Sequence, residues 1–249
     1  MGSSSTVTIV TVVRNDAKGL ERTMDSVRAQ DYADREYIVV DGASTDGTTE
    51  VVRRRAAEVA RWISEPDRGI YDAMNKGTRL ATGEYVCFMN AGDRFESSGT
   101  LAAMFVPSPR SELLWGDCII ESNRGEQYDS ARDVLGRLHR QMTVSHQSLF
   151  VRREALLARP FDSRLRIAAD YDFLCERLLA GATWEYRPLP VSRINDTGAS
   201  ARIFRTSIRE KRRISLARFP SRRLSIIAYY AMLQAYMTVK TLLRGSGGR

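Results

Sequence analysis

Residues 37–47 have the sequence Tyr37-Ile38-Val39-Val40-Asp41-Gly42-Ala43-Ser44-Thr45-Asp46-Gly47. Its first four residues are apolar and mostly β-branched, which favours a buried strand, and the residues after them favour a turn. A similar apolar run lies upstream at residues 7–13, and between the two runs Leu20, Met24 and Val27 recur at helical spacing. Strand and helix alternate here with short connections, which is typical of a doubly wound, mainly parallel α/β sheet.

The alternation continues along the chain. Val52, Ala56, Val59 and Ile63 share the spacing of one helix face, so we expect a helix over this segment. Further strands are expected at residues 113–120, 147–152 and 184–191, and further helices at residues 70–81, 100–105 and 170–180. Pro107-Ser108-Pro109 interrupts the pattern, and we take it as the boundary between two halves of one domain, residues 1–106 and 107–201.

The basic charge of the chain is concentrated in one segment. The 249 residues include 38 basic and 30 acidic side chains, a formal net charge of +8. Nine basic residues and one acid lie between Arg202 and Arg223, which leaves 29 of each sign for the rest of the chain. A nucleic-acid enzyme would more often spread positive charge over its binding face, so we expect no nucleic-acid partner.

An apolar segment follows the basic cluster directly, because residues 224–239 contain no charged side chain. As a helix it would span about 24 Å, short of the roughly 30 Å of a bilayer's hydrocarbon core. We therefore expect residues 202–249 to form a basic, apolar helical tail that meets an anionic membrane surface through residues 202–243, or docks on the protein body. If the Lys240 side chain snorkels to the membrane surface, a helix extended to Leu243 could just span the bilayer. A plain amphipathic helix that closes the fold is the alternative.

The cysteines and the N-terminus indicate the compartment. Cys87, Cys118 and Cys175 are odd in number and lack metal-ligand spacing, which predicts buried thiols in a reducing compartment. The first five residues lack the basic segment and apolar stretch of a secretory signal. We expect a cytoplasmic protein that is peripheral on the cytoplasmic face of the membrane.

A further apolar run, Tyr85-Val86-Cys87-Phe88-Met89, stops abruptly at Asn90-Ala91-Gly92-Asp93. Open α/β sheets bind ligands where their strands end. Because Ala91 and Gly92 add no bulk, Asp93 can approach a cation or a diphosphate closely. A polar turn that closes the strand is the alternative.

Other polar residues are expected at the same edge of the sheet. Asp41 ends its strand, where an acid can accept a hydrogen bond from a base or a ribose hydroxyl, whereas Ser44 or Asp46 could instead cap the next helix. Arg68 precedes the helix expected at 70–81, where the guanidinium and the helix dipole would both attract a diphosphate.

Two observations restrict the kind of ligand site expected at this edge of the sheet. A salt bridge from Arg68 to Asp67 or Asp72 is the alternative to diphosphate binding. The first strand is not followed by a Gly-x-Gly-x-x-Gly sequence, and the chain has no Gly-Lys-Ser/Thr loop, so ordinary dinucleotide and P-loop sites are excluded.

The order of these motifs resembles the family 2 glycosyltransferases with the GT-A fold, in the subset that builds bacterial cell-surface polysaccharides and glycolipids. The motifs are Thr11-Val12-Val13-Arg14-Asn15, then residues 40–48, then 69–77, then Ala81-Thr82-Gly83-Glu84-Tyr85 leading into Asn90-Ala91-Gly92-Asp93. The resemblance runs from about residue 6 to about residue 195. It implies an inverting transferase: residues 1–106 would bind a nucleotide-sugar donor, a UDP-sugar, and residues 107–201 a hydroxyl of a lipid-linked or cell-surface saccharide acceptor.

The resemblance also implies roles for single residues at the donor site. The nucleotide and its diphosphate would contact Thr11, Val13, Asn15, Asp41, Ser44, Asp46, Arg68, Asn75 and Asn90. Asp93 matches the last acid of the family's metal-binding Asp-x-Asp motif, which holds Mg²⁺ or Mn²⁺ against the diphosphate. Asn90 and Gly92 stand where acids are common, so Asp93 is the only carboxylate in the motif, and we expect weak metal binding without donor.

In the second half, Ala169-Asp170-Tyr171-Asp172-Phe173 resembles the family's Glu-Asp motif, with Asp170 in the place of the catalytic base. Inverting transfer needs a base that takes the acceptor hydroxyl's proton as its oxygen attacks. Asp172 is the alternative base. Alternatively, Asp170 and Asp172 only stabilise the N-terminus of a helix. His146 would orient the acceptor or meet the diphosphate, or would be a core histidine, and Trp115 would contact the acceptor.

Two other hypotheses stay open. A sugar nucleotidyltransferase shares this architecture but would need a Gly-rich phosphate turn after the first strand, and Arg14-Asn15-Asp16 is not one. A non-catalytic membrane-binding protein that keeps only the fold is the other, and Asn90 and Gly92 in place of acids give it support.

Overall fold

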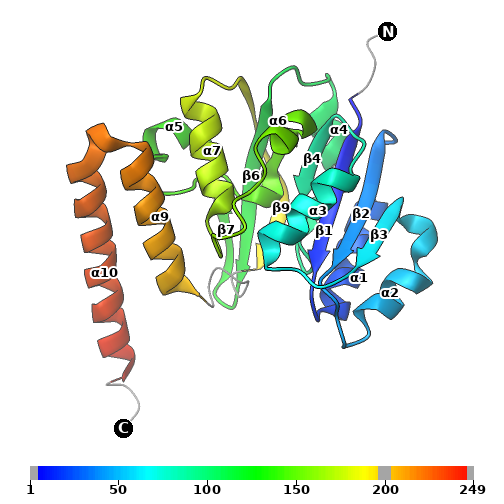
Figure 1. Ribbon diagram of the computed structural model, residues 1–249, viewed down its shortest axis with the longest axis horizontal. Helices are drawn as coiled ribbons and strands as arrows, with labels where there is room; N and C mark the ends of the chain where they lie inside the picture. Colours follow the sequence, from blue (N-terminus) through cyan, green and yellow to red (C-terminus); the bar gives the residue numbers. More distant parts are fainter. Residues whose placement is uncertain (1–4, 196–202, 246–249) are drawn as a thin grey trace.

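Nine strands of the described residues, 5–195 and 203–245, form one mixed sheet in this computed structural model (Figure 1). Their order is β3-β2-β1-β4-β8-β6-β9-β5, with β7 paired to β6. The strands are β1 (Val7–Val13), β2 (Arg35–Asp41), β3 (Arg61–Ser64), β4 (Tyr85–Phe88), β5 (Arg94–Phe95), β6 (Leu113–Ser122), β7 (Gly125–Asp129), β8 (Leu149–Arg152) and β9 (Trp184–Asn195).

Helices lie on both faces of this sheet (Figure 1). The α-helices are α1 (Ala17–Arg28), α2 (Thr48–Arg54), α3 (Ile70–Leu80), α4 (Thr100–Phe105), α5 (Val134–Arg137), α6 (Arg153–Ala158), α7 (Ala169–Leu179), α9 (Phe204–Arg218) and α10 (Arg223–Gly245). Three single turns of 3₁₀ helix are η1 (Ala56–Glu58), η2 (His146–Ser148) and η3 (Pro220–Arg222).

The direction of the strands brings distant segments to one edge of the sheet. Strands β3, β2, β1 and β4 are parallel, so the segments that follow them meet at their common carboxyl edge. Strand β8 pairs with β4 antiparallel, with Cys87 opposite Phe150 and Tyr85 opposite Arg152. The start of β8, and η2 just before it, therefore lie beside the end of β4.

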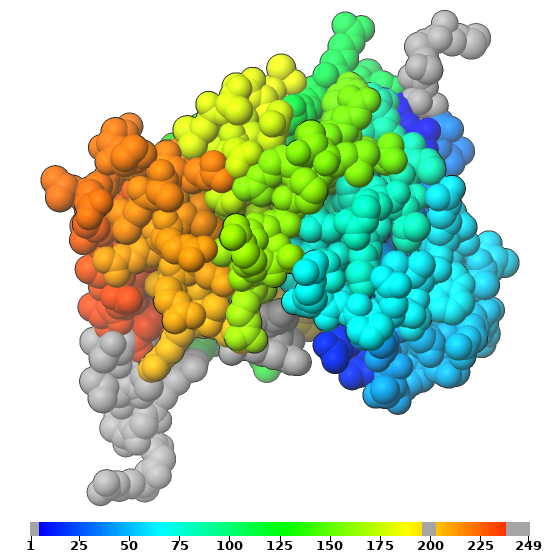
Figure 2. All heavy atoms as spheres, in the orientation of Figure 1, coloured from blue at the N-terminus to red at the C-terminus, as the bar shows by residue number. Residues whose placement is uncertain are grey.

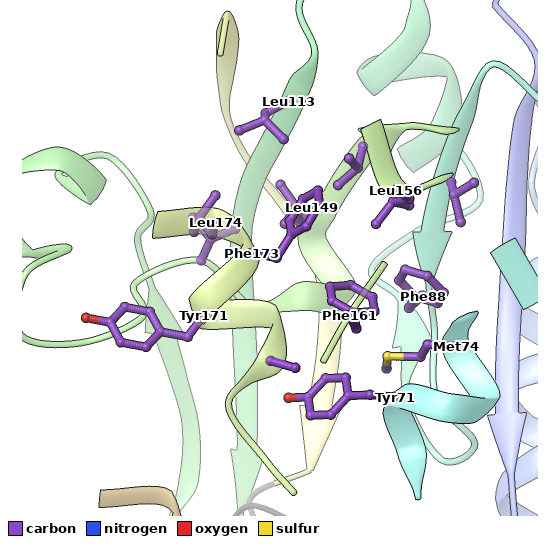
Figure 3. Close-up of a cluster of buried hydrophobic side chains, with 14 of the residues drawn as sticks. Tyr71, Met74, Phe88, Leu113, Leu149, Leu156, Phe161, Tyr171, Phe173 and Leu174 are labelled. Carbon is purple, nitrogen blue, oxygen red and sulfur yellow. The ribbon is translucent and has the colours of Figure 1, made fainter. Parts of the chain in front are cut away.

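Alternation along the strands divides the core into two apolar clusters. Val10 and Val12 of β1 belong to a cluster with Met74 of α3 and Phe173 of α7, which Figure 3 shows. Ile9 of β1 belongs instead to a second cluster, whose members include residues of α1 and α4. Because successive side chains of a strand point to opposite faces, each face of the sheet is covered by its own set of helices.

Most of the elements expected from sequence are confirmed. The helices expected at 70–81, 100–105 and 170–180 are α3, α4 and α7, and the later strands are β6, β8 and β9, with η2 replacing the first residues expected in β8. The three cysteines are buried and unpaired, as expected.

One expected helix is wrong in its second half. Helix α2 ends at Arg54, Val59 is extended, and Ile63 lies in β3 opposite Val40 of β2. The residues that share a helical spacing here therefore belong to a helix, a turn and an edge strand in succession. A longer helix would have left the backbone N–H and C=O groups on this edge of β2 without partners, whereas β3 pairs with them.

The basic, apolar tail forms a helical hairpin, α9 and α10, that docks on the protein body (Figure 1). Ile214 and Ser215 of α9 are buried, and Ser215 Oγ lies 2.9 Å from the Tyr171 hydroxyl of α7. In α10, Ile226 and Tyr230 are buried, and the Tyr230 hydroxyl donates to the Arg140 carbonyl at 2.7 Å. No helix in the described part of the chain has both the length and the apolar character needed to cross a bilayer.

Candidate active site

The turn that follows β4 is anchored on helix α1. The Asp93 N–H donates to the Asn90 carbonyl at 3.0 Å, and Gly92 has a φ of 94°, which favours glycine. Thr23 of α1 donates through Oγ1 to the Asp93 carbonyl at 2.6 Å and accepts from the Gly92 N–H at 3.0 Å. The turn therefore has one fixed shape, from which the side chains of Asn90 and Asp93 extend.

Four side chains from four elements form a continuous polar chain beside this turn, which we call the Asn90–Tyr71 chain. Asn90 Nδ2 lies 2.9 Å from Nε2 of His146, which is in η2. His146 Nδ1 lies 3.2 Å from Oδ2 of Asp170, in the first turn of α7. The Tyr71 hydroxyl of α3 donates to Asp170 Oδ1 at 2.8 Å, and Figure 3 shows Tyr71 between α3 and α7.

The contacts of His146 favour one tautomer. An ionised carboxylate can only accept hydrogen bonds, so Nδ1 carries the proton and donates to Asp170. When Nε2 carries no proton it accepts a hydrogen bond from the Asn90 amide. Asn90 thus fixes the orientation of the imidazole that contacts Asp170.

The carboxylate of Asp170 is held in its charged form, although its residue is only 8% exposed. Burial alone would raise its pKa, but the hydrogen bond and charge of His146, the Tyr71 hydrogen bond and the positive charge of Lys211 outweigh burial and lower the pKa of Asp170 below its ordinary value. The Tyr171 N–H adds another hydrogen bond at 2.8 Å. Asp170 is therefore ionised at neutral pH, which is the form that a general base requires.

Asp93 has the opposite electrostatic character. Its residue is 9% exposed, and burial raises the pKa of this carboxyl, against the lowering effect of the Gln147 hydrogen bond and the charge of His146. Gln147 Nε2 donates to Asp93 Oδ2 at 2.6 Å, and the Asn195 backbone N–H contributes a further hydrogen bond. Because His146 and Gln147 are neighbours in η2, this one turn of helix contacts both Asp170 and Asp93.

The β4 turn offers two oxygen ligands to a divalent cation. Asn90 Oδ1 is buried and has no hydrogen-bond partner within the described part of the chain, and Asp93 provides a carboxylate. Residues 5–195 and 203–245 contain no cluster of three or more His, Cys, Asp or Glu side chains that could hold a metal ion. One carboxylate and one amide oxygen fit Mg²⁺ or Mn²⁺ when a diphosphate and water complete the shell.

The segments after β1 and β2 are tied together at the same edge of the sheet. The Asn15 N–H donates to Ser44 Oγ at 2.7 Å, and the Thr45 N–H donates to Asn15 Oδ1 at 2.8 Å. Asp46 accepts from the Thr48 N–H at 3.1 Å, at the start of α2, and from the Ala17 N–H at 3.3 Å. The structure thus brings Asn15, Ser44 and Asp46 together, and Asp46 also has the capping role considered as the alternative.

Asp41 is fully buried and organises this region. Its carboxylate accepts from the Ser44 N–H at 3.0 Å, from the Ser44 hydroxyl, and from Ser64 Oγ of β3 at 2.6 Å. These bonds hold the segment after β2 against β3. Because Asp41 is fully buried, it could accept a hydrogen bond from a nucleotide only if its carboxylate became accessible.

Three residues expected to contact the donor point into the protein interior instead. Thr11 is fully buried, and its hydroxyl accepts from the Tyr37 hydroxyl at 3.0 Å. Val13 is buried in the second apolar cluster. Both ends of the Asn75 amide bind the backbone of Phe161, at 2.8 and 3.0 Å, so this side chain joins α3 to the segment before α7.

Trp115 also belongs to the core rather than to an acceptor site. It is buried, stacks on Trp184 with ring centroids 5.1 Å apart, and donates through Nε1 to the Ala131 carbonyl at 3.3 Å. Trp115 lies on β6 between Leu149 of β8 and Tyr186 of β9, and its side chain belongs to the first apolar cluster.

The remaining two expected residues have ionic partners. Arg68 forms the salt bridge to Asp72, at 3.2 Å, that we considered as its alternative role, but its side chain is 80% exposed and stays free to reorient. Asp172 is held by Arg159 at 2.6 Å and by Arg218 of α9 at 2.9 Å. The arrangement favours Asp170 over Asp172 as the base, because Asp172 fastens α9 to α7.

Sequence reasoning missed three contributors to the site: Tyr71, Gln147 and Lys211. Tyr71 lies within the 69–77 motif and Gln147 adjoins His146, so the motifs themselves point to both residues. Lys211 lies in the tail, which the motifs do not cover. Only the docking of α9 on α7 reveals its proximity to Asp170.

The fold and the site define an enzyme of the GT-A fold: the sheet is parallel around β1, becomes antiparallel at β8, and gathers polar groups at one carboxyl edge. Comparisons with known proteins give the family. The model of "Glycosyl transferase family 2" matches residues 8–105. A glycosyltransferase of Mycobacterium tuberculosis (strain H37Rv) is 37% identical over 191 residues, which cover 72% of this chain and 71% of the relative. The chain therefore belongs to glycosyltransferase family 2 and is a glycosyltransferase.

Other relatives and solved structures agree. A "PGL/p-HBAD biosynthesis glycosyltransferase" of Mycobacterium bovis (strain BCG) is 35% identical over 172 residues, 66% of either chain. S. aureus TarS 1–349 in complex with UDP superposes with a TM-score of 0.67 at 18% identity, over 86% of this chain and 65% of that one. The mannosyltransferase PcManGT from Pyrobaculum calidifontis, in complex with GDP-Man and Mn²⁺, superposes with a TM-score of 0.64 at 21% identity. The superposition covers 98% of this chain and 80% of that one. The two structures show a common fold.

Proposed function

We propose that this glycosyltransferase moves a sugar, with inversion, from a UDP-sugar to a hydroxyl of a lipid-linked or cell-surface saccharide precursor. The observation that carries the proposal is the Asn90–Tyr71 chain, because it holds an ionised Asp170 beside the turn that follows β4. In the proposed reaction the acceptor oxygen forms a bond to the anomeric carbon while the bond from that carbon to the diphosphate breaks. Asp170 takes the acceptor proton, and UDP leaves with the electron pair.

The donor would lie along the carboxyl edge of β1, β2 and β4. Asn15, Ser44 and Asp46 are placed for the nucleoside, and the mobile guanidinium of Arg68 can swing from Asp72 to the diphosphate. Asp93 and Asn90 would hold Mg²⁺ or Mn²⁺, which supplies positive charge to the diphosphate as it leaves. Solved structures of GT-A neighbours with UDP, with UDP-GlcNAc, and with GDP-Man and Mn²⁺ support a nucleotide-sugar donor and a cation.

The acceptor class is supported by a relative and by the tail. The relative from M. bovis is named for PGL/p-HBAD biosynthesis, which supports a glycolipid precursor as acceptor. Leu224 and Met232 of α10 are 83% and 64% exposed, Arg223 begins the same helix, and Arg222 ends η3 just before it. This combination suits a peripheral site on the anionic cytoplasmic face of a membrane.

A donor panel tests the proposal. Purified protein is offered UDP-, GDP- and dTDP-sugars with Mg²⁺ or Mn²⁺, and release of nucleoside diphosphate is measured. We expect release from a UDP-sugar, and binding of UDP by the same protein. If no donor releases nucleoside diphosphate and the protein does not bind UDP, the proposal is overturned. Formation of a nucleotide sugar from a nucleoside triphosphate would indicate a nucleotidyltransferase instead.

A further inference from the structure

The segment before α7 and helix α9 line an open surface cavity of about 330 Å³ that has no role in the proposed reaction. Its lining consists of Arg164, Leu165, Arg166, Arg209, Glu210 and Arg213. Figure 2 shows the yellow-green atoms that precede α7 against the orange atoms of α9. We infer that this cavity, the arginine cavity, binds a phosphate or diphosphate group carried by the acceptor.

The charge of the arginine cavity is only partly offset by the protein, through Asp162 and Glu210. Arg166, Arg209 and Arg213 form no ion pair with any side chain in the described part of the chain, and Arg164 pairs only with Asp162, at 2.8 Å. Elsewhere the same side chain is regularly paired: Arg177 binds Glu112 at 2.6 Å, and Arg218 binds Asp172 at 2.9 Å. Arginine side chains of like charge that line one cavity repel one another, and an anion bound among them lowers that repulsion.

The one acid in the lining is already engaged. Glu210 Oε1 accepts from the Arg166 N–H at 2.9 Å, and Oε2 accepts from the Ile167 N–H at 3.0 Å. Both oxygens are thus committed to the backbone, and they fasten the segment before α7 to α9. Glu210 fixes the two walls of the cavity relative to each other and leaves the arginine side chains without a carboxylate partner in the lining.

The position of the arginine cavity points to the acceptor. Arg166 precedes Asp170 by four residues, so their Cα atoms lie within about 15 Å of each other. Helix α9 also brings Lys211, two residues from Arg209 and Arg213, close enough to lower the pKa of Asp170. An anion bound in this cavity would therefore lie on the α7–α9 side of the base, whereas the donor segments after β1 and β2 are in the other half of the sheet.

The chemistry of the lining selects phosphate. Guanidinium groups bind phosphate oxygens through paired N–H donors, and several of them around one group favour a multiply charged anion. A diphosphate fits a volume of about 330 Å³, whereas the single apolar lining residue, Leu165, offers little surface to a lipid chain. The inference rests on the proposed function, since it assigns this anion to the lipid-linked acceptor. A phospholipid headgroup has the same chemistry and is the other source.

Binding of inorganic pyrophosphate tests the site. Titration calorimetry is done with saturating UDP, so that the donor site is filled, and without added Mn²⁺, because the free cation would itself bind pyrophosphate. The variant Arg209→Gln/Arg213→Gln should bind pyrophosphate at least tenfold more weakly than the unaltered protein. The matched control Arg79→Gln/Arg205→Gln removes the same charge from exposed positions outside the cavity and should stay within twofold. Equal weakening in both variants, or no binding by the unaltered protein, would overturn the inference.

A vesicle arm separates the two sources of phosphate. If the cavity takes the acceptor's own phosphate, both double variants should lose binding to phosphatidylglycerol vesicles to the same small extent. A much larger loss for Arg209→Gln/Arg213→Gln would support the same site with a phospholipid headgroup as its ligand, and would overturn the assignment to the acceptor. Release of UDP from a UDP-sugar is measured in parallel: its absence contradicts the proposed function, while the pyrophosphate titration still decides whether the site exists.

Discussion

His146 Nδ1 lies 3.2 Å from Asp170 Oδ2, and Nε2 of the same ring lies 2.9 Å from the Asn90 amide. One imidazole therefore connects the turn after β4, in the donor half, with the start of α7, in the acceptor half. The connection depends on the antiparallel pairing of β8 with β4, which places η2 at the carboxyl end of β4. His146 is thus a positioning residue whose loss should affect Asp170 without removing the carboxylate.

Replacing His146 with alanine should shift the pH dependence of the reaction. His146 lowers the pKa of Asp170, so the pKa of this carboxyl should rise in His146→Ala, and the acid limb of kcat/KM should move to higher pH. Loss of a hydrogen bond to a charged group, about 1.5–3 kcal/mol, should also slow transfer by roughly 10- to 100-fold. The other histidine gives the control: His139→Ala should leave the acid limb where it is. An unchanged acid limb in His146→Ala would contradict the role of the histidine.

Asp170 and Asp172 form a matched pair of carboxylates, two residues apart on the first turn of α7. Asp170→Asn should lower kcat by about 10²- to 10⁴-fold with little change in donor KM, because it removes the base. Asp172→Asn should leave kcat within a few fold and lower the free energy of unfolding by about 1–3 kcal/mol, because Arg159 and Arg218 lose a partner. Steady-state kinetics and urea denaturation measure the two effects, and the reverse pattern would exchange the two assignments.

The same arginine contacts predict how stability responds to acid. Burial would raise the pKa of Asp172, but hydrogen bonds from Arg218 and Arg159 outweigh burial, so its folded pKa lies below the unfolded value of about 3.9. This stabilisation is fully present above the unfolded pKa and is lost as the pH falls through the folded pKa. The Tm of the unaltered protein should therefore fall more steeply below about pH 4 than that of Asp172→Asn. Parallel slopes would show that Asp172 titrates like an exposed acid.

Asp93 should control donor affinity through the cation. In Asp93→Asn, UDP binding in the presence of Mn²⁺ should weaken by about tenfold or more, since a carboxylate ligand is lost. In a chelator the variant and the unaltered protein should bind UDP alike, which is the control for an indirect effect on folding. Because burial raises the pKa of Asp93, Mn²⁺-dependent binding of UDP should begin to fail at a higher pH than for an exposed aspartate. Equal UDP affinities with Mn²⁺ would exclude Asp93 as a ligand.

Sequence patterns predicted the sheet and the place of the site better than they predicted side-chain directions. The apolar runs and the turn after each of them located β1, β2 and β4, because these signals are local. Thr11 and Asn75 occupy the right motifs but face the interior, and their partners, Tyr37 and Phe161, are distant in sequence. No local rule identifies such partners, since they depend on which elements pack together.

The connection of His146 with Asp170 and Asn90 shows the same limit. Each of the three residues could be proposed from its own motif, yet their mutual contact follows from the reversal of direction between β4 and β8. That reversal is a long-range pairing that spacing along the chain does not encode. Tyr71, which completes the chain of contacts, lies within the 69–77 motif, but its bond to Asp170 joins α3 to α7 and is likewise long-range.

The exposed apolar face of α10 should decide membrane binding. Deleting the whole tail would not be a clean test, because Ile214, Ser215, Ile226 and Tyr230 are buried against the body and their loss would unfold it. Leu224→Ser/Met232→Ser changes only exposed side chains, so the Tm should hardly change. This variant should bind phosphatidylglycerol vesicles several-fold more weakly, because each buried methylene contributes about 0.8 kcal/mol. Leu157→Ser/Leu179→Ser removes exposed leucines from α6 and α7 and is the matched control. Equal vesicle binding by both variants would leave α10 as a helix that only closes the fold.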